Sequence, residues 1–234
     1  MAEAEERHWW YPATRELLRA SLEPLLQPGA RVLDAGCGTG SAGGWLGDRF
    51  SACGIDPEPL ALDLYRRRRP GARLVRAGIE ALPFAAESFD AALVVTVLYH
   101  EAVVDPQLAV RSIAATLRPG GVLCLLEPGL RRLRRGHDRV TRTARRFAPS
   151  DLRALLVGAG LEPLRVTGAY AFLVAPAWIK SILERGRSTS DLEEGGWRGD
   201  RLLAALAARE RRWLARRDLP VGLSVLALAR KPAG

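Results

Sequence analysis

The stretch Val32-Leu33-Asp34-Ala35-Gly36-Cys37-Gly38-Thr39-Gly40 decides the fold. An apolar run that ends at an acid and continues into alternating glycines predicts a buried strand, a tight turn and the start of a helix. Glycine suits such a turn because it adopts unusual backbone angles and lets a ligand approach the main chain. A strand-helix turn that binds nothing is the alternative, but three alternating glycines after an acid argue against it. The stretch therefore predicts a ligand-binding turn.

The alternation of short strands and helices continues along the chain. Strands are expected at residues 31–34, 52–55, 73–77, 91–95, 122–126, 164–167 and 222–229, and helices at 13–26, 41–50, 57–69, 105–117, 149–159 and 201–217. Two of these strands, 91–95 and 122–126, are continuously apolar, as strands buried on both faces are. This pattern predicts an α/β fold, a Rossmann-like seven-stranded and mostly parallel sheet with helices on both faces.

Three segments lie outside this rhythm. Residues 1–30 are expected to form an N-terminal helical cap, and residues 31–234 the main domain. About residues 169–220 are expected to be a helical insertion before the last strand, which would form a lid or an interface. Residues 128–146 are expected to be a basic loop.

Composition limits the class of protein. A chain of 234 residues with 48% apolar and 26% charged residues is ordinary for a globular domain, which excludes disordered and collagen-like classes. The longest apolar run is too short to span a bilayer, and the acidic N-terminus lacks the order of a signal peptide. Three cysteines, at positions 37, 53 and 124, have no metal-like spacing. We expect a reduced, cytoplasmic protein without a metal site or membrane partner, as a monomer or homodimer.

The net charge of +9 comes almost entirely from arginine, since lysine occurs only at Lys180 and Lys231. Arginine-rich composition can reflect the genome as much as a ligand. The charge favours acidic over cationic partners but is weak support for nucleic acid.

A second acid follows the second expected strand, in Gly54-Ile55-Asp56-Pro57. Asp56 lies 16 residues after Gly40. A carboxylate at this position can accept hydrogen bonds from both hydroxyls of an adenosine ribose. It can also cap the helix expected to begin at Pro57. Both roles are open to one residue, and the position favours the ribose.

These motifs resemble the class I S-adenosylmethionine-dependent methyltransferases, especially the small-molecule branch related to ubiquinone- and menaquinone-biosynthesis enzymes. The resemblance covers about residues 8 to 167. Besides the glycine stretch and Asp56, it rests on Glu80-Ala-Leu-Pro-Phe84, Ser88-Phe89-Asp90, Leu98-Tyr99-His100 and Leu117-Arg118-Pro119-Gly120-Gly121. Their order and spacing together are very specific.

The resemblance implies a donor site for S-adenosylmethionine, with S-adenosylhomocysteine as product. The expected cofactor-binding residues are Asp34, Gly36, Cys37, Gly38, Gly40, Asp56, Pro57, Ile79, Glu80, Thr96 and Tyr11. The glycines would pass the methionine part, with Asp34 near its amino group. Ile79 and Glu80 would flank the adenine, and Thr96 would lie beneath the sulfonium. The chain departs from the family at Gly78, where related enzymes often carry Asp.

The N-terminal segment His8-Trp9-Trp10-Tyr11 resembles a cap found in a subset of these enzymes. It would fold over the donor and exclude water. Alternatively, the tryptophans only attach the first helix to the body. Arg15 could meet the donor carboxylate or could be a solvated helix residue.

Catalytic candidates are few because there are three histidines. His100 and Tyr99 follow the fourth strand, where ligands bind in open parallel sheets. His137, beside Asp138, is a further candidate for general base, or an exposed loop residue. Such a base is optional, because the donor sulfonium is already electrophilic. Glu127 could bind an acceptor cation or make a structural hydrogen bond.

Eight arginines lie between positions 131 and 146. They form a solvated basic loop or an anchor for an acidic acceptor, through bidentate pairs. The similarity of Arg145-Arg146-Phe147 to related sequences also favours a structural role for some of them.

The residues thus indicate methyl transfer to nitrogen or oxygen, less readily carbon, of a small or peptide-like and possibly acidic metabolite, in secondary metabolism. One alternative is a nicotinamide-dependent (NAD) oxidoreductase, because Gly38 to Gly43 fits dinucleotide spacing. Another is an RNA methyltransferase, favoured by the charge. It lacks support because no Asp/Asn-Pro-Pro-aromatic turn follows the fourth strand and no RNA-binding module is visible.

Overall fold

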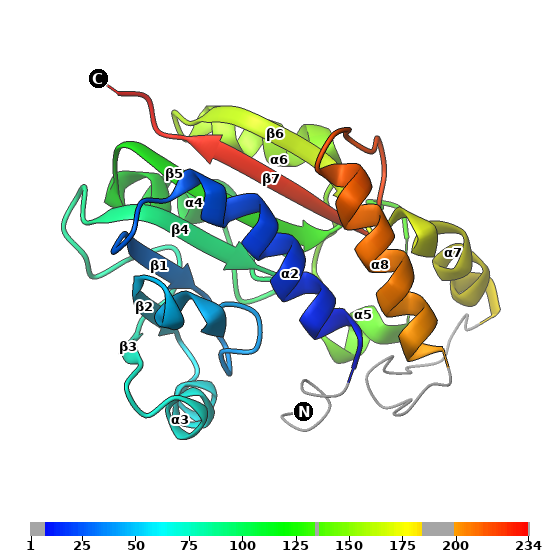
Figure 1. Ribbon diagram of the computed structural model, residues 1–234, viewed down its shortest axis with the longest axis horizontal. Helices are drawn as coiled ribbons and strands as arrows, with labels where there is room; N and C mark the ends of the chain where they lie inside the picture. The colour runs from blue at the N-terminus through cyan, green and yellow to red at the C-terminus, as the bar shows by residue number, and fades with distance from the viewer. Residues whose placement is uncertain (1–7, 134–135, 184–198, 234) are drawn as a thin grey trace.

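The computed structural model describes residues 8–133, 136–183 and 199–233, with the backbone alone at positions 136 and 137. Seven strands form one sheet in the order β3-β2-β1-β4-β5-β7-β6 (Figure 1). The strands are β1 (Arg31–Ala35), β2 (Ser51–Asp56), β3 (Arg73–Arg76), β4 (Phe89–Val95), β5 (Leu117–Pro128), β6 (Glu162–Ala169) and β7 (Ser224–Arg230). Strand β7 runs antiparallel to both of its neighbours, β5 and β6, and the other neighbouring pairs in the described sheet are parallel. The predicted Rossmann-like, mostly parallel sheet is confirmed.

Helices cover both faces of the sheet. Helices α4 (Pro106–Thr116) and α6 (Pro149–Gly158) pack on one face, and α2 (Trp10–Leu22) and α8 (Asp200–Leu214) on the other. Alternate residues of β1 serve the two cores, with Leu33 in the first and Val32 in the second. Leu18 and Leu22 of α2 are fully buried, and each such side chain contributes roughly 1.5–3 kcal/mol. The sheet is therefore the middle layer of three.

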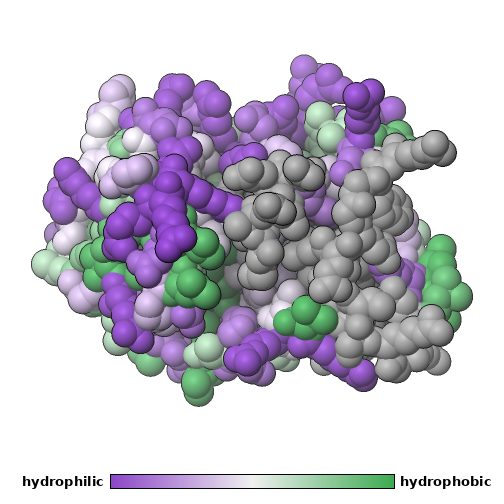
Figure 2. All heavy atoms as spheres, turned by 90° about the horizontal axis from the view of Figure 1, so that it is seen from below, coloured by the Kyte–Doolittle hydropathy of each residue, from purple (hydrophilic) through white to green (hydrophobic). Residues whose placement is uncertain are grey.

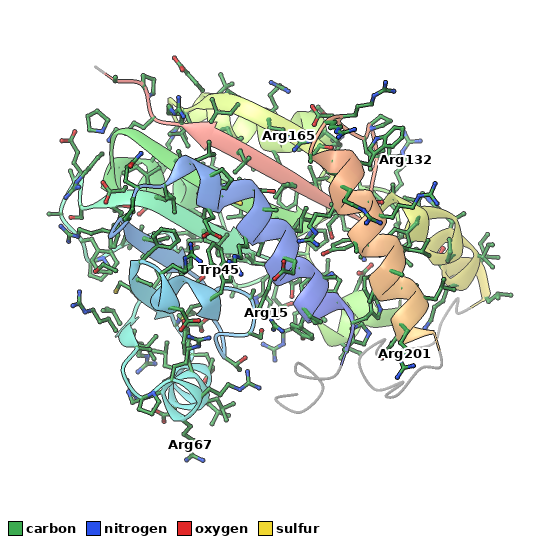
Figure 3. All side chains as sticks on the ribbon, viewed as in Figure 1. Arg15, Trp45, Arg67, Arg132, Arg165 and Arg201 are labelled. Atoms are coloured by element: carbon green, nitrogen blue, oxygen red, sulfur yellow. The ribbon has the colours of Figure 1, made fainter. Side chains whose placement is uncertain are left out.

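Helix α3 (Pro59–Arg68) packs beside β2 and β3 at one edge of the sheet. Its Arg66 and Arg67 are exposed, and Arg67 points away from the body of the protein (Figure 3). Hydrophilic side chains accordingly gather over α3 on the left of the face shown in Figure 2. Within residues 8–133, 136–183 and 199–233, none of the helices combines the length and apolar character needed to cross a bilayer.

The helix predicted at residues 41–50 does not form as an α-helix. Turns and a 3-10 helix, η2 (Gly44–Asp48), occupy this segment. Gly43, Gly44 and Gly47 explain the difference, because glycine disfavours helix interiors by roughly 0.8–1 kcal/mol per residue relative to alanine. The spacing of the apolar residues Trp45, Leu46 and Phe50 is compatible with an α-helix, which the sequence therefore predicted here.

The described residues of the basic segment 128–146 do not form a simple solvated loop. It contains helix α5 (Gly136–Val140) and ends in a buried ion pair between Arg146 and Asp138. Nη1 of Arg146 also donates to the carbonyl of Gly129 at 3.1 Å. Arg131, although exposed, pairs with Asp151 of α6. Several arginines of this segment therefore hold the fold, because a buried guanidinium needs an anionic partner.

The insertion before β7 contains one helix that the sequence did not predict, α7 (Val174–Leu183). Pro176 lies in its first turn, where proline costs no hydrogen bond. A short 3-10 helix, η3 (Ala171–Leu173), precedes it. The predicted helix at 201–217 is confirmed as α8, one residue earlier at its start and three shorter at its end.

Tyr170 joins the insertion to the N-terminal helix. Its backbone is in the left-handed region, with φ of 57°. Glu210 of α8 accepts hydrogen bonds from the N–H groups of Tyr170 and Ala171. The Tyr170 hydroxyl lies 2.7 Å from Oγ1 of Thr14 on α2, and both side chains are buried. Helices α2 and α8 consequently lie side by side, linked again by Arg211 and Glu16 at 2.8 Å (Figure 1).

We predict that Thr14→Val and Tyr170→Phe each lower the free energy of unfolding by about 1–3 kcal/mol, because each leaves the other buried hydroxyl without its partner. The double variant should lose less than the sum of the two. Urea denaturation of the four proteins measures this coupling. Strictly additive losses would show that the two hydroxyls do not stabilise each other.

Candidate functional site

The glycine turn after β1 has the backbone that its sequence demands. Gly36, Gly38 and Gly40 have φ of 75°, 53° and 80°, all in the left-handed region. The N–H groups of Gly36 and Cys37 donate to the carbonyl of Ile55 at 2.9 and 2.8 Å. A Cβ on Gly36 would lie 2.3 Å from Cγ2 of Val97. The turn thus lies directly against the turn that follows β4.

Asp56 closes the second strand and holds the glycine turn. Its Oδ2 accepts from the N–H of Gly38 at 3.0 Å, and its Oδ1 accepts from the N–H of Glu58 at 2.9 Å. The helix begins at Pro59 with Glu58 as its N-cap, so the alternative of Asp56 as helix cap is wrong. Pro57 lies between them, and its carbonyl accepts from Nε of Arg76 at 3.1 Å. Asp56 therefore lies beside the glycine turn.

Asp34 is buried at the end of β1, with 3% of its surface exposed. Its Oδ2 has no hydrogen-bond partner among the described residues. A Cβ on Gly43 would lie 2.0 Å from that oxygen, so the carboxylate fits only against glycine. Burial, reinforced by the charge of Asp56, raises the pKa of Asp34 to about 7. A buried carboxylate oxygen without a donor beside an open glycine turn suits a cationic ligand group.

The side chain of Cys37 faces away from this ligand space. It packs in a small cluster with Leu62 and Tyr65 of α3. Burial raises the pKa of the Cys37 thiol, which keeps it protonated and unreactive. The thiol contacts the turn through a long hydrogen bond to the carbonyl of Gly38, at 3.8 Å.

Ile79 and Glu80 follow the carboxyl end of β3. Ile79 is buried with 6% of its surface exposed. Oε1 of Glu80 accepts from the N–H of Asp105 at 2.7 Å, which ties this segment to the start of α4. One oxygen of Glu80 is thus already engaged within the protein.

The turn after β4 is tightly held. Thr96 has φ of 52°, its N–H donates to the carbonyl of Leu126 at 2.7 Å, and its hydroxyl donates to the carbonyl of Val95 at 2.7 Å. Glu127, at the end of β5, is fully buried. Its carboxylate accepts from the N–H groups of Val97, Leu98 and Tyr99 at 3.0, 2.9 and 3.2 Å. The structural role considered for Glu127 is therefore the one observed.

The candidate catalytic residues Tyr99 and His100 follow in this turn. Burial and the nearby Glu127 raise the pKa of Tyr99 to about 12, so Tyr99 is a neutral phenol near pH 7. Nδ1 of His100 accepts from the N–H of Ala102 at 3.1 Å, and His100 pairs with Thr143 in an isolated antiparallel bridge. The side chain of the third candidate, His137, lies outside the described residues.

The N-terminal helix reaches the glycine turn. Nη1 of Arg15, on α2 (Figure 3), donates to the carbonyl of Ser41 at 3.0 Å. Trp9 is buried in edge contact with Tyr170, at 5.7 Å between ring centroids. Tyr11 lies in the first turn of α2, in edge contact with Trp10 at 5.0 Å. Trp9 therefore does attach the helix to the body, while Arg15 contacts the turn itself rather than solvent alone.

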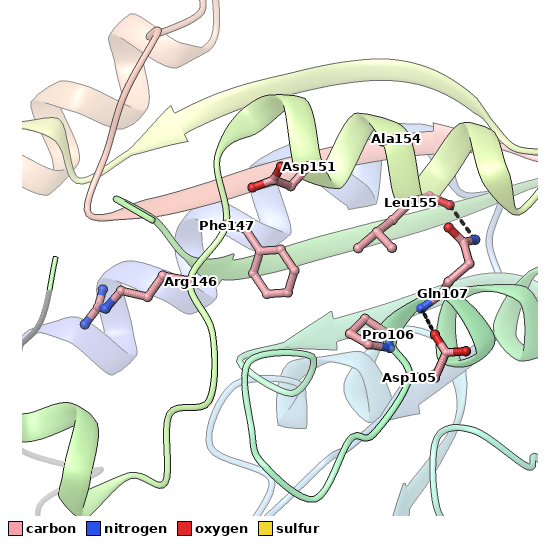
Figure 4. A pocket seen from close by; sticks show the side chains of 8 residues that line it. All are labelled: Asp105, Pro106, Gln107, Arg146, Phe147, Asp151, Ala154 and Leu155. Atoms are coloured by element: carbon pink, nitrogen blue, oxygen red, sulfur yellow. Dashed lines mark hydrogen bonds between the residues drawn. The ribbon is translucent and has the colours of Figure 1, made fainter. Parts of the chain in front are cut away.

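A hollow of about 460 Å³ lies between the start of α4 and the first turns of α6 (Figure 4). It is lined by Asp105, Pro106, Gln107, Arg146, Phe147, Asp151, Ala154 and Leu155. Its polar side chains already serve the protein, as in the bond from Nε2 of Gln107 to the carbonyl of Leu155 at 3.1 Å. The hollow therefore offers a ligand little unpaired polar chemistry.

Because β1, β2 and β4 are parallel, their carboxyl ends lie on the same side of the sheet. The predicted residues at those ends therefore come together. The ends of β1, β2 and β4 place Asp34, Asp56 and Thr96 there. Two contacts were missed from the sequence, the packing of Gly43 on Asp34 and the bond from Arg15 to Ser41. The only sequence signal for the first was the run of glycines, and there was none for the second.

Residues 33–125 match the family described as methyltransferase domain. The chain is 31% identical to a malonyl-[acyl-carrier protein] O-methyltransferase of Enterobacter lignolyticus over 197 residues, covering 79% of this chain and 77% of that protein. This protein belongs to the S-adenosylmethionine-dependent methyltransferases. Within the class I, small-molecule branch, it is also 40% identical over 114 residues to a ubiquinone biosynthesis O-methyltransferase of Methylocella silvestris. That match covers 46% of this methyltransferase but only 43% of its relative.

The fold agrees with this family. A solved S-adenosylmethionine-dependent methyltransferase from Thermotoga maritima superposes with a TM-score of 0.62 at 20% identity, covering 97% of this chain and 91% of that one. The matches give no support to a nicotinamide-dependent oxidoreductase or an RNA methyltransferase.

We predict that Asp34 makes the methyltransferase less stable as pH rises. Between about pH 4, where the carboxyl ionises in the unfolded chain, and about pH 7, the folded state binds more protons. The free energy of unfolding therefore falls across this range and levels off above it. Asp34→Asn should flatten the decline, as measured by urea denaturation at a series of pH values.

The matched control for this experiment is Asp63→Asn, because Asp63 is an exposed residue of α3. It should retain the wild-type dependence on pH. An unchanged slope in Asp34→Asn would show that Asp34 ionises alike in both states.

Proposed function

We propose that this methyltransferase transfers a methyl group from S-adenosylmethionine to an oxygen or nitrogen atom of a small or peptide-like metabolite. One observation carries the donor assignment: the unpartnered buried oxygen of Asp34 lies beside three left-handed glycines. The cationic amino group of the donor suits an anionic oxygen. Its nucleoside suits a turn of glycines, which have no side chains to obstruct it.

The donor would lie across the carboxyl ends of β1, β2 and β4. Asp34 would receive its ammonium, the glycine turn with the backbone of Cys37 would pass its methionine chain, and Asp56 beside Pro57 would accept its ribose hydroxyls. On the adenine, Ile79 would pack by apolar contact and the free oxygen of Glu80 would meet the exocyclic amine. Thr96 would lie under the sulfonium, with α2 and Tyr11 covering the site. These residues fit the group because they combine acids, backbone and a small apolar wall.

When bound, the donor supplies an electrophilic methyl group. What the protein must add is alignment of the acceptor atom and exclusion of water, which can lower a barrier by up to roughly 7–11 kcal/mol. Helices α2 and α8, which are joined through Tyr170, would exclude water from the site.

Tyr99 and His100 are better suited to orient an acceptor than to deprotonate it. The Tyr99 phenol is neutral near pH 7 and is already hydrogen-bonded to Thr141, so it offers an acceptor a polar contact rather than a base. Because Nδ1 of His100 accepts from a backbone N–H, the neutral ring carries its proton on Nε2. An N–H at Nε2 donates to an acceptor oxygen and has no lone pair to take a proton. Catalysis by a histidine base would then depend on His137.

Two observations favour an acidic acceptor that is methylated on oxygen. The curated relatives named above act as O-methyltransferases, one of them on malonyl-[acyl-carrier protein]. The chain has a net charge of +9, and the exposed side chains of Arg132 and Arg139 have no anionic partner among the described residues. Such arginines can attract a carboxylate or phosphate.

We predict that Asp56→Ala weakens binding of S-adenosylhomocysteine by about tenfold or more, because two charge-assisted hydrogen bonds to the ribose are lost. Isothermal calorimetry measures the change. The control Asp63→Ala, on the exposed side of α3, should bind as the wild type does. Unchanged affinity in Asp56→Ala would refute the ribose assignment.

A ligand comparison tests the function itself. S-adenosylhomocysteine at about one hundred times its dissociation constant should stabilise the fold by about 2.7 kcal/mol in thermal denaturation, and reduced nicotinamide dinucleotide should not. Labelled donor incubated with metabolite pools would then report the acceptor by mass spectrometry. Stabilisation by the dinucleotide and not by the nucleoside would overturn the proposal.

A further inference from the structure

Glu127 is a buried acid that serves one turn of the backbone. Its carboxylate makes three of its hydrogen bonds to consecutive residues, Val97, Leu98 and Tyr99, and none of its surface is exposed. A single acceptor group thus fixes three successive peptide units. Burying an ionised carboxylate costs free energy because the group loses its hydration. The three backbone hydrogen bonds compensate for that loss.

The turn that Glu127 holds lies at the donor site. The side chain of Val97 packs so closely on Gly36 that a Cβ on that glycine would not fit. Thr96, immediately before it, is a non-glycine residue in the left-handed region, a conformation that persists only where surrounding contacts enforce it. Tyr99 and His100 follow directly. The hydrogen bonds of Glu127 therefore fix the turn that lines the proposed donor site. They also fix Tyr99 and His100, the two candidate contacts of the acceptor.

Charged and titratable groups around Glu127 influence its ionisation. Arg145, from the segment after α5, favours the ionised form, and its Nη1 also donates to the carbonyls of Leu98 and Val103 at 3.0 and 2.7 Å. Tyr99 is the titratable neighbour on the turn. From β7, Val225 and Ser224 lie opposite Glu127 and Pro128 and carry no charge.

We propose that Glu127 is a positioning residue for methyl transfer, which sets the place of the turn Val97–Tyr99 beneath the donor methyl group only while its carboxylate is ionised. This role rests on the proposed donor site. Oε1 of Glu127 accepts two N–H groups and Oε2 only that of Tyr99, so protonation disturbs the fewest hydrogen bonds at Oε2. A hydroxyl at Oε2 is a weaker acceptor than a carboxylate oxygen and holds the N–H of Tyr99 less tightly. The turn then relaxes at its Tyr99 end. Burial raises the pKa of Glu127 to about 7, so the change falls in the physiological range.

The experiment uses the full chain saturated with donor whose methyl carbon is labelled with ¹³C. The methyl resonance reports its surroundings, since carbonyl oxygens near a sulfonium methyl make weak C–H···O contacts. In the wild type, we expect this resonance to move with pH between about 5.5 and 8.5, with a midpoint near 7. Glu127→Gln should lose this movement with pH, because the ammonium of the bound donor keeps Asp34, the other buried acid of the site, ionised across this range. Its resonance should also differ from that of the wild type at high pH.

Asp90→Asn is the matched control. Asp90 is also a carboxylate on a central strand, and it accepts from the N–H of Arg31 and from Nη1 of Arg118, both at 2.8 Å, at the opposite end of β4. Both variants should lower the melting temperature, but Asp90→Asn should keep the wild-type pH curve. A wild-type curve in Glu127→Gln would overturn the role of Glu127. Absence of any bound methyl signal in the wild type would overturn the donor site, and this role with it.

A measurement without variants covers the case in which Glu127→Gln does not fold. The amide resonances of Val97, Leu98 and Tyr99 in the wild type should titrate together, with a midpoint near 7 and the largest movement at Tyr99. Amide positions that do not change with pH would overturn the proposal.

Discussion

Backbone N–H groups just beyond the ends of the strands need acceptors, and buried or half-buried carboxylates supply them in this protein. Asp56 accepts from Gly38, Glu127 from the turn after β4, and Glu210 from the turn after β6. Each acid holds a short irregular segment that the regular sheet cannot pair. Because an unmade hydrogen bond in the interior costs roughly 1–3 kcal/mol, these turns have little freedom once the acids are in place. The site is consequently built from fixed backbone.

Asp34 is the exception that indicates function. It occupies the same kind of position as Asp56, at the end of a parallel strand, yet one of its oxygens has no donor among the described residues. Burying that oxygen is unfavourable, as the raised pKa of Asp34 shows. This unfavourable burial is the observation on which the proposed contact of Asp34 with the cationic amino group of the donor rests.

The proposed donor half and the proposed acceptor half of the site have different origins in the chain. The proposed donor half comes from β1, β2 and β4, within the 33–125 segment that matches the methyltransferase domain. The walls beyond it come from α2 and from the insertion before β7, which meet through Tyr170 and Thr14 although 156 residues separate them. The relative with 40% identity aligns over 43% of its own length, whereas the relative with 31% identity aligns over 77%.

The sequence by itself determined the order of strands and helices, the glycine turn and its flanking acids. These features have local signatures: apolar runs, glycine at positions of positive φ, and an acid near the ends of β1 and β2. It misjudged residues 41–50, where glycines weaken a helix, and it did not predict α7. Only the tertiary structure decided that Glu127 serves the turn after β4, that Arg146 is buried on Asp138, and that Arg15 contacts Ser41. Those contacts join residues distant in the chain, and the pairing of distant polar groups depends on packing that no local pattern encodes.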